Sequence, residues 1–359
     1  MLRDNQTPFA ALAFEQTHRN GARMAVVVAR ARFDLFPDGS LARAEKQFLV
    51  LADVYDGPPT TSPLIDVSDL APFKPFADVT VIGDAYAPNG VASRQWTAGV
   101  KIGERRALIR VNGPRKWEPI SKSGAGRWRL AEAALTAQAP SDYRYAAGGR
   151  IIGHPRGEAD HDNPIGAGVL DPAVTSPFFA YDAPQIDSEQ APIVDAFARP
   201  APQGLGPVAP VWGPRLRYAG TYDDAWRALD PPRPPDDHDY RFWQVAPPQL
   251  QLPGYLRAGE IIRLGRLARD AETVDFYIPD VEPWAHFRWI DGRDVFARMN
   301  RDGLHIDMRG DAPWRVDLTF RCWLEICPRF YCVDLALTDA RGAAPLPFAR
   351  EDGLAEASA

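Results

Sequence analysis

Cysteine is scarce in this sequence of 359 residues. The three cysteines, Cys322, Cys327 and Cys332, lie at five-residue intervals. An odd number leaves at least one thiol outside any disulfide, and the spacing differs from the Cys-x-x-Cys pairs of zinc sites. We therefore expect reduced, mostly buried thiols and no bound metal or other cofactor.

Long apolar runs are also missing. Residues 1–8 lack the hydrophobic stretch of a signal peptide, and no uncharged apolar run is long enough to span a bilayer. The formal net charge is −6, whereas nucleic acids and anionic membranes select proteins with clustered Lys and Arg. We expect a cytoplasmic protein that binds neither nucleic acid nor membrane.

Motifs for catalysis are the third absence. The sequence contains no Gly-x-Ser-x-Gly elbow, no Gly-x-x-x-x-Gly-Lys phosphate loop and no His-Glu-x-x-His pair. Gly166-Ala167-Gly168 lacks the preceding strand and following helix of a dinucleotide site. With only six histidines in the chain, we predict that the protein is not an enzyme.

Two polar clusters keep an enzymatic alternative open. The first is a loop that contains His154, Asp160, His161 and Asp162, whose imidazole and carboxylate groups are ligands of the kind that divalent metals use. A metal-assisted hydrolase is the alternative function that this loop suggests, although its spacing matches no known site. The second cluster spans residues 236–241, where a turn or helix cap is the simpler interpretation.

Proline and glycine are abundant, with 35 and 28 residues. Proline breaks helix interiors and cannot donate to a sheet ladder, so it must concentrate in turns and edges. Long helices are therefore not expected. The 45% hydrophobic residues indicate a buried core. The chain length and the strand patterns described below predict a mainly β fold with two antiparallel, sandwich-like lobes.

The first lobe is predicted at residues 1–147. Residues 24–36 form an apolar run that ends at Pro37-Asp38-Gly39-Ser40, which indicates a strand followed by a hairpin turn. Residues 78–86 form a second strand, and the following Asn89-Gly90 supplies the positive φ of a tight turn. Residues 96–102 and 107–111 are predicted to pair across Gly103.

Residues 148–253 lose this periodicity and are rich in proline, yet they contain many aromatic residues. Solvated linkers are poor in aromatics, so we predict an ordered, irregular segment packed on the lobes. One helix is expected at residues 221–229, with Thr221 as its cap and Asp224 in its first turn.

The second lobe is predicted at residues 254–350 as a β-meander. Its strands are expected at residues 274–278, 285–290, 295–299, 304–308, 314–326 and 331–337, with turns at Asp291-Gly292 and at Arg301-Asp302-Gly303. The small, polar residues 351–359 are predicted to be a flexible tail.

An aromatic and arginine-rich run, residues 212–222, is the best candidate for a binding surface. Trp212, Arg215, Arg217 and Tyr222 belong to the residue types that dominate protein-recognition hot spots. The alternative is that these side chains pack an irregular segment into the core. The pattern alone does not separate these interpretations.

Several short segments, spread over most of the chain, stand in a distinctive order. They are Ala31-Arg32-Phe33-Asp34-Leu35, Ser68-Asp69-Leu70-Ala71-Pro72-Phe73-Lys74-Pro75, Asn163-Pro164-Ile165-Gly166-Ala167-Gly168, Trp212-Gly213-Pro214-Arg215 and Ala219-Gly220-Thr221-Tyr222-Asp223-Asp224-Ala225-Trp226. In this order they resemble the DUF2169 family of type VI secretion accessory proteins, which are described as effector adaptors or chaperones.

The resemblance implies an adaptor that acts by binding. Its expected partners are an effector protein, or the PAAR-type tip domain of that effector, and the VgrG-type spike onto which the effector is loaded. The family supplies no agreed catalytic residues. A third hypothesis, a carbohydrate-binding β-sandwich that uses exposed tryptophans, is also consistent with the ten tryptophans of the chain.

Overall fold

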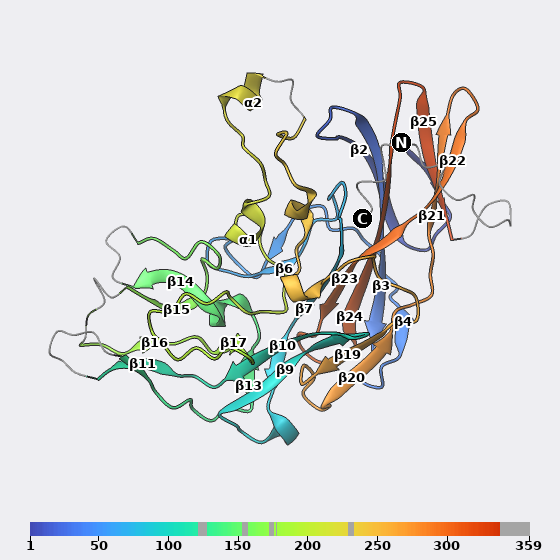
Figure 1. Cartoon of the computed structure of the whole chain (residues 1–359). Helices are drawn as coiled ribbons and strands as arrows, with labels where there is room; N and C mark the ends of the chain where they lie inside the picture. Colours follow the sequence, from blue (N-terminus) through green and yellow to red (C-terminus); the bar gives the residue numbers. More distant parts are fainter. Residues whose placement is uncertain (121–127, 153–156, 172–175, 177, 229–232, 338–359) are drawn as a thin grey trace.

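The computed structural model describes residues 1–120, 128–152, 157–171, 176, 178–228 and 233–337. Within this part the protein is mainly β, as predicted, with strands β1 to β25 and only short helices (Figure 1). None of the described helices is long and apolar enough to cross a membrane. The predicted tail at residues 351–359 lies outside the described residues.

The largest sheet has seven strands and contains the two longest strands of the described chain. Its order is β18 (Gln251–Leu252), β7 (Ala77–Ile82), β23 (Asn300–Asp307), β24 (Trp314–Glu325), β3 (Arg23–Leu35) and β2 (Ala10–Thr17), and β4 (Leu41–Arg43) pairs with β3. β3 is buried over most of its length. Residues 24–29 form a continuous apolar run, whereas in the second half Arg30 and Arg32 alternate with apolar residues and are buried as well.

Two further sheets have five and four strands. The first has the order β17 (Ile186–Ser188), β10 (Arg105–Asn112), β9 (Gln95–Ile102), β19 (Ile261–Gly265) and β20 (Thr273–Tyr277). The second has the order β1 (Leu2–Asn5), β25 (Phe330–Ala336), β21 (Trp284–Trp289) and β22 (Asp294–Arg298). Apolar side chains from all three sheets meet in one hydrophobic core.

Strands from the first and last parts of the sequence lie side by side in these sheets. β24 pairs with β3, β19 pairs with β9, and β25 pairs with β1. This pairing corrects the predicted division of the sheets, because described strands of the two predicted lobes share hydrogen-bonded ladders and do not form separate lobes. A local hydrophobic pattern indicates that a strand forms but does not specify its distant partner.

The predicted C-terminal meander is likewise corrected. β21 pairs with β22 and β25, whereas β23 pairs with β24 and, in parallel, with β7. The six predicted strands all form, but they belong to three sheets. β20 lies in the five-stranded sheet, β21, β22 and β25 lie in the four-stranded sheet, and β23 and β24 lie in the seven-stranded sheet. Arg301-Asp302-Gly303, predicted as a turn, lies inside β23 at an irregularity in the ladder, where Arg301 and Asp302 are buried.

Four smaller sheets complete the described structure. They are β11 (Lys116–Pro119) with β12 (Trp128–Leu130) and β16 (Tyr181–Asp182), β8 (Asp84–Tyr86) with β13 (Gln138–Pro140), β14 (Ala147–Ile152) with β15 (Ala167–Leu170), and β5 (Val54–Tyr55) with β6 (Leu64–Asp66). Trp117 of β11 and Leu170 of β15 belong to a second, smaller hydrophobic core. The strands β11, β14, β15 and β16 lie at the left of Figure 1.

The predicted turns form where glycine and asparagine favour them. The β3–β4 hairpin contains Gly39 at φ 83°, and Asn89 has φ 55° in the short helix η1 (Pro88–Gly90). Gly39 also lies against β20, since a Cβ atom there would be 1.9 Å from the carbonyl oxygen of Asp275. Conformation and close approach both require glycine at this position.

Apart from the short strands β16, β17 and β18, residues 178–228 and 233–253 are irregular, and they pack against the sheets. Leu205, Val208, Ala209 and Ala246 are buried in the main core. The helices of this region are short: α1 (Gly213–Leu216), α2 (Asp224–Ala228), η3 (Tyr240–Trp243) and η4 (Pro248–Leu250), while η2 (Tyr143–Tyr145) precedes β14. These proline-rich segments therefore bury apolar side chains in the main core.

We expect limited trypsin digestion to cut after Arg227 well before it cuts after Arg215. Arg227 is exposed on α2, whereas Arg215 is buried, and proteases cleave exposed segments that can unfold locally. Mass spectrometry of the earliest fragments distinguishes the two sites. Cleavage after Arg215 as early as after Arg227 would show instead that residues 186–216 form a linker.

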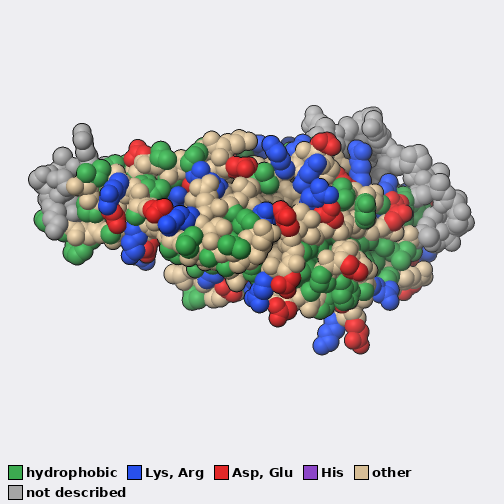
Figure 2. Space-filling model, turned by 90° about the horizontal axis from the view of Figure 1, so that it is seen from below, with side chains coloured by type: hydrophobic (Ala, Val, Ile, Leu, Met, Phe, Trp, Pro, Cys, Tyr) green, Lys and Arg blue, Asp and Glu red, His purple; other side chains and the backbone are tan. Residues whose placement is uncertain are grey.

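The surface seen from below in Figure 2 carries charges of both signs. Lys and Arg side chains are interspersed with Asp and Glu on this face, and apolar side chains lie between them. The face shows no large field of one sign. Charged surfaces of this mixed kind favour solubility more than the attraction of a polyanion.

Candidate functional site

The four predicted binding residues divide into two buried and two exposed side chains. Trp212 is only 2% exposed, and its ring meets that of Tyr143 edge-on, with the centroids 5.3 Å apart. Arg215 is 4% exposed. Arg217 and Tyr222 lie at the surface. The prediction of Trp212 and Arg215 as partner contacts is therefore corrected, because their side chains are packed inside the protein.

Arg215 holds two irregular segments together. Its Nε donates to the Phe242 carbonyl at 2.9 Å and its Nη1 donates to the Val208 carbonyl at 2.9 Å, while the guanidinium lies 5.2 Å from the Phe242 ring centre. Burial lowers the pKa of this group, although nearby Asp53 opposes the shift. Arg215 therefore stabilises the segment by satisfying carbonyl groups that helices and sheets leave free.

Beyond α1 the chain forms a projection that we call the arm, residues 217–228 and 233–241. Figure 1 shows it extending away from the sheets, with α2 near its end. The two legs are joined at the base, where Asp239 N donates to the Tyr218 carbonyl at 3.0 Å and His238 Nδ1 lies 2.9 Å from the Ala219 carbonyl oxygen. Arg241 stacks on Tyr218 at 4.4 Å.

The next contact along the arm uses Thr221 and Asp237. The Thr221 amide and hydroxyl donate to the two carboxylate oxygens of Asp237, at 2.9 and 2.7 Å. These bonds lower the pKa of Asp237, the amide bond contributing most. Thr221 was predicted to cap α2, but Asp223 does so, accepting from the Trp226 amide at 2.8 Å. Thr221 does not cap the helix because it binds the carboxylate of Asp237 on the other leg.

The described end of the arm carries an aromatic pair, with Tyr222 just before α2 and Trp226 within it, and no residue of α2 is buried. Tyr222 is 50% exposed, and its ring meets Trp226 edge-on at 4.7 Å. Trp226 Nε1 donates to the Arg233 carbonyl at 2.8 Å, which links the legs once more. A tyrosine held in this way presents a large apolar area to solvent without much conformational freedom to lose on binding.

The two polar clusters of the sequence have structural roles where they are described. Asp160 accepts from the amides of Asp162 and Asn163 at 2.9 Å, which closes its own loop. His161 is largely exposed and lies 3.5 Å from Asp162, whereas His154 falls outside the described residues. No group of three His, Cys, Asp or Glu side chains that could hold a metal ion occurs among the described residues.

In the second cluster, the turn and cap interpretation is confirmed. Asp239 caps η3 by accepting from the Arg241 amide at 2.8 Å, and Asp237 binds Thr221 as described above. The cysteines are unpaired: Cys322 and Cys332 are buried, and Cys327 is partly exposed. Burial raises the pKa of the Cys322 thiol.

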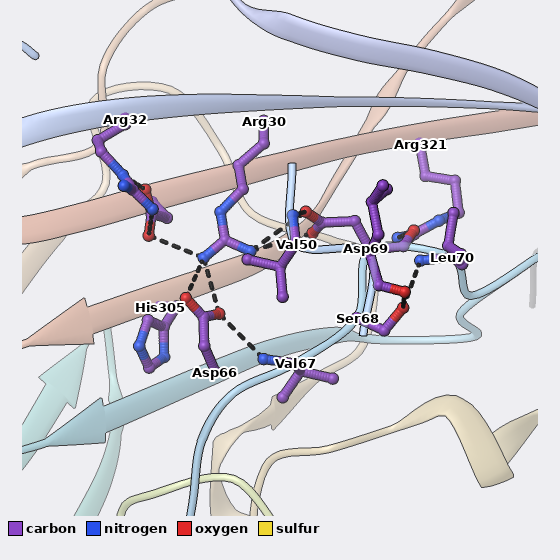
Figure 3. Close-up of polar contacts among 12 residues, drawn as sticks. Arg30, Arg32, Val50, Asp66, Val67, Ser68, Asp69, Leu70, His305 and Arg321 are labelled. Atoms are coloured by element: carbon purple, nitrogen blue, oxygen red, sulfur yellow. Dashed lines mark hydrogen bonds and ion pairs between the residues drawn. The ribbon is translucent and has the colours of Figure 1, made fainter. Parts of the chain in front are cut away.

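A second candidate site, which sequence reasoning missed, is a buried ionic network around Arg30 of β3 (Figure 3). Arg30 Nη2 donates to Asp66 and Asp317, both at 2.8 Å, and Nη1 donates to Asp69 at 3.2 Å. Burial lowers the pKa of Arg30, but the three carboxylates outweigh it and raise the pKa. The charge therefore stays on the guanidinium inside the protein.

Asp317 of β24 is the most enclosed member of this network. Besides Arg30, it accepts from Arg32 Nε at 2.7 Å and lies 2.9 Å from Arg315 Nε. Burial by itself raises the pKa of Asp317, but the surrounding arginines lower it to about 2. The carboxylate is therefore ionised at neutral pH.

Lys74, Asp78 and Arg321 form further buried ionic contacts in the same region as Arg30. Lys74 Nζ donates to Asp78 at 2.8 Å, and Asp78 also accepts from the amides of Val245 and Ala246 at 3.0 and 3.1 Å. Arg321 donates to Asp302, whose pKa is raised by burial although Arg321 opposes the shift. Asp78 thus attaches the irregular segment to β7.

These charged groups line a pocket beside β7 and β23. His305 of β23 lies in its wall, with Nδ1 2.9 Å from the Thr80 hydroxyl oxygen. Burial lowers the pKa of His305 to about 4, so the imidazole is neutral at physiological pH. Arg32, Asp69 and Lys74 come from residues 31–35 and 68–75. Two of the segments that carry the family resemblance therefore contribute charged side chains to this region.

The fold and these contacts define a mainly β protein whose distant segments are joined by buried ion pairs. The family model "Uncharacterized protein conserved in bacteria (DUF2169)" matches residues 20–321, and the chain belongs to this family. No curated protein and no solved structure matches the chain.

Proposed function

We propose that this protein is a non-enzymatic adaptor or chaperone of a type VI secretion system. In this role it binds an effector, or the PAAR-type tip domain of the effector, in the cytoplasm and assists its loading onto the VgrG-type spike. The proposal rests on the resemblance of the motif order to that group of proteins, and one observation of the structure supports a binding role. That observation is the arm, which exposes Tyr222 next to Trp226.

The arm has the physical properties of a recognition element. Its backbone is held at several points by hydrogen bonds between the legs, yet α2 buries no residue against the body of the protein. Aromatic and arginine side chains contribute most to protein interfaces when they become desolvated by a partner. Of the four residues that the sequence predicts as binding residues, Arg217 and Tyr222 are exposed.

We expect Tyr222→Ala to weaken binding to the cognate effector about tenfold or more, because it removes an exposed aromatic anchor. Arg217→Ala should weaken binding to a smaller extent. Binding is measured by isothermal titration calorimetry with the effector or PAAR-type protein encoded beside this gene. Thermal unfolding should remain close to wild type, since neither side chain is buried.

Tyr277→Ala is the matched control, because Tyr277 is an exposed tyrosine on β20 at the opposite end of the view in Figure 1. It should leave binding unchanged. Equal losses for Tyr222→Ala and Tyr277→Ala would argue against the arm as the contact. The adaptor function itself is contradicted if deletion of the gene leaves the secretion and the cellular level of every neighbouring effector unchanged.

A further inference from the structure

The pocket beside β7 and β23 combines buried charge with unused hydrogen-bonding capacity. Its lining includes Arg30, Lys74, His305, Thr319 and Arg321, together with three aspartates, Asp66, Asp69 and Asp78. The two arginines and the lysine balance the three aspartates in formal charge. The hydrogen bonds, however, are not distributed equally between the basic and acidic groups.

The acceptors of the pocket are already occupied. Both oxygens of Asp78 accept bonds, from Gln244 and Ala246 at one oxygen and from Lys74 and Val245 at the other. Both oxygens of Asp69 accept from Arg30, and one also accepts from the Val50 amide at 2.8 Å. Asp66 accepts from Arg30, Arg315 and the Val67 amide. A cation entering the pocket would find few free lone pairs.

The donors, in contrast, are not exhausted. Lys74 Nζ carries three protons and has one hydrogen-bond partner, Asp78, within the described part of the chain. Arg30 Nε and Arg321 Nε are buried without a partner among the described residues. The Thr319 hydroxyl makes no hydrogen bond to any other described residue. Buried donors of this kind are costly unless a ligand or water satisfies them.

His305 adds the observation that points most directly to a ligand. It is 9% exposed, and its Nε2 has no partner within the described part of the chain. When the Thr80 hydroxyl donates to Nδ1, the imidazole proton lies on Nε2, which then becomes another donor. In this tautomer the neutral ring adds a donor to the pocket without adding charge.

We infer that this pocket binds a single carboxylate, which accepts hydrogen bonds from Lys74, His305 and Thr319. A carboxylate matches the excess of donors, and its single negative charge suits a lining that is already neutral overall better than the double charge of a phosphate monoester. The carboxylate belongs to a small free acid, to an acidic side chain or to a chain terminus. This inference goes beyond the proposed function and does not depend on the arm.

The test is a titration of the full-length protein with acetate at constant ionic strength, followed by the ¹⁵N signals of the histidine side chains. We expect a saturable shift of the His305 signals in the millimolar range, as suits a ligand of four heavy atoms, and no saturable shift for exposed His161. Acetamide, which has the same shape without the charge, should produce no such shift. An equal response to acetamide, or no saturable response to acetate, would overturn the inference.

A pair of variants tests the assignment of the site. Thr319→Val keeps the side-chain shape and should weaken acetate binding several-fold, whereas Thr273→Val, at an exposed position on β20, should not. Loss of acetate affinity in both variants, or in neither, contradicts the assignment. If Thr319→Val fails to fold, the His305 titration of the wild-type protein still decides the question.

Three further ligands identify the source of the carboxylate. Tetra-alanine with a free carboxyl end should compete with acetate if the pocket takes a chain terminus, and its amidated form should not. N-acetyl-aspartate amide should compete if the pocket takes an acidic side chain. Binding of acetate alone supports a small free acid, and each of these results supports a carboxylate site.

Discussion

Asp317→Asn should lower the free energy of unfolding by about 3–5 kcal/mol at pH 7. The substitution removes the charge that Arg30, Arg32 and Arg315 share inside the protein, and so leaves buried guanidinium groups without full compensation. Breaking one partner of a buried ion pair costs more than losing a surface pair, because the remaining charges cannot be solvated. Equilibrium unfolding in urea measures the difference.

Asp275→Asn is the matched control. Asp275 pairs with Arg263 across β19 and β20 at a partly solvent-exposed position, with the two side chains 31% and 52% exposed. Surface pairs contribute up to about 1 kcal/mol, so this variant should remain close to wild type. A loss in Asp317→Asn no greater than that in Asp275→Asn would show that the buried network contributes little to stability.

The same network predicts how stability depends on pH. The folded pKa of Asp317, about 2, lies below the unfolded value of about 3.9, so its contribution is present above that value and is lost as the pH falls towards 2. The folded pKa of His305, about 4, lies below the unfolded value of about 6.5, so stability is lost as the pH falls between these values. Asp317→Asn should abolish only the lower of these two decreases.

Trp212→Ala should also destabilise the protein strongly, by about 3–5 kcal/mol. The indole is fully enclosed and packs against Tyr143, so its removal leaves a cavity that the surrounding irregular segments can close only in part. Denaturant unfolding of the wild-type and variant proteins gives the value. Trp212→Phe should cost less, because part of the apolar volume is retained.

Tyr222→Ala serves as the comparison for Trp212→Ala, since it lies in the same sequence run but on the exposed arm. Its effect on unfolding should be within about 1 kcal/mol. The two variants thus separate packing from binding within residues 212–222. A Trp212→Ala protein that unfolds like wild type but no longer binds its partner would show that Trp212 contributes to binding and not to packing.

Much of the local structure could be predicted because it depends on neighbouring residues. The apolar run at residues 24–36 formed β3, Asn89 took the positive φ expected of it, and α2 formed within residues 221–229. Each of these features follows from side-chain pattern or backbone preference within one short segment. The mainly β class follows in the same way from many short strands separated by glycine and proline.

The burial of Trp212 and Arg215 could not be predicted with the same means. Tryptophan and arginine occur both in interface hot spots and in packed irregular segments, so the residue types left both interpretations open. The choice depends on Tyr143, Val208 and Phe242, which contact these side chains only in the folded chain. Tyr222, ten positions after Trp212, remains at the surface because the arm carries it away from the sheets.

The sequence by itself determined the strands, the tight turns, the scarcity of helix and the family to which the chain belongs. Only the tertiary structure decided which strands share a sheet and where the buried charges meet. Arg30 and Asp317 are separated by 287 positions, and they come together because β3 and β24 pair along their length. Local preferences act between neighbouring residues, whereas an ion pair of this kind depends on the register of two distant strands, which the whole core selects.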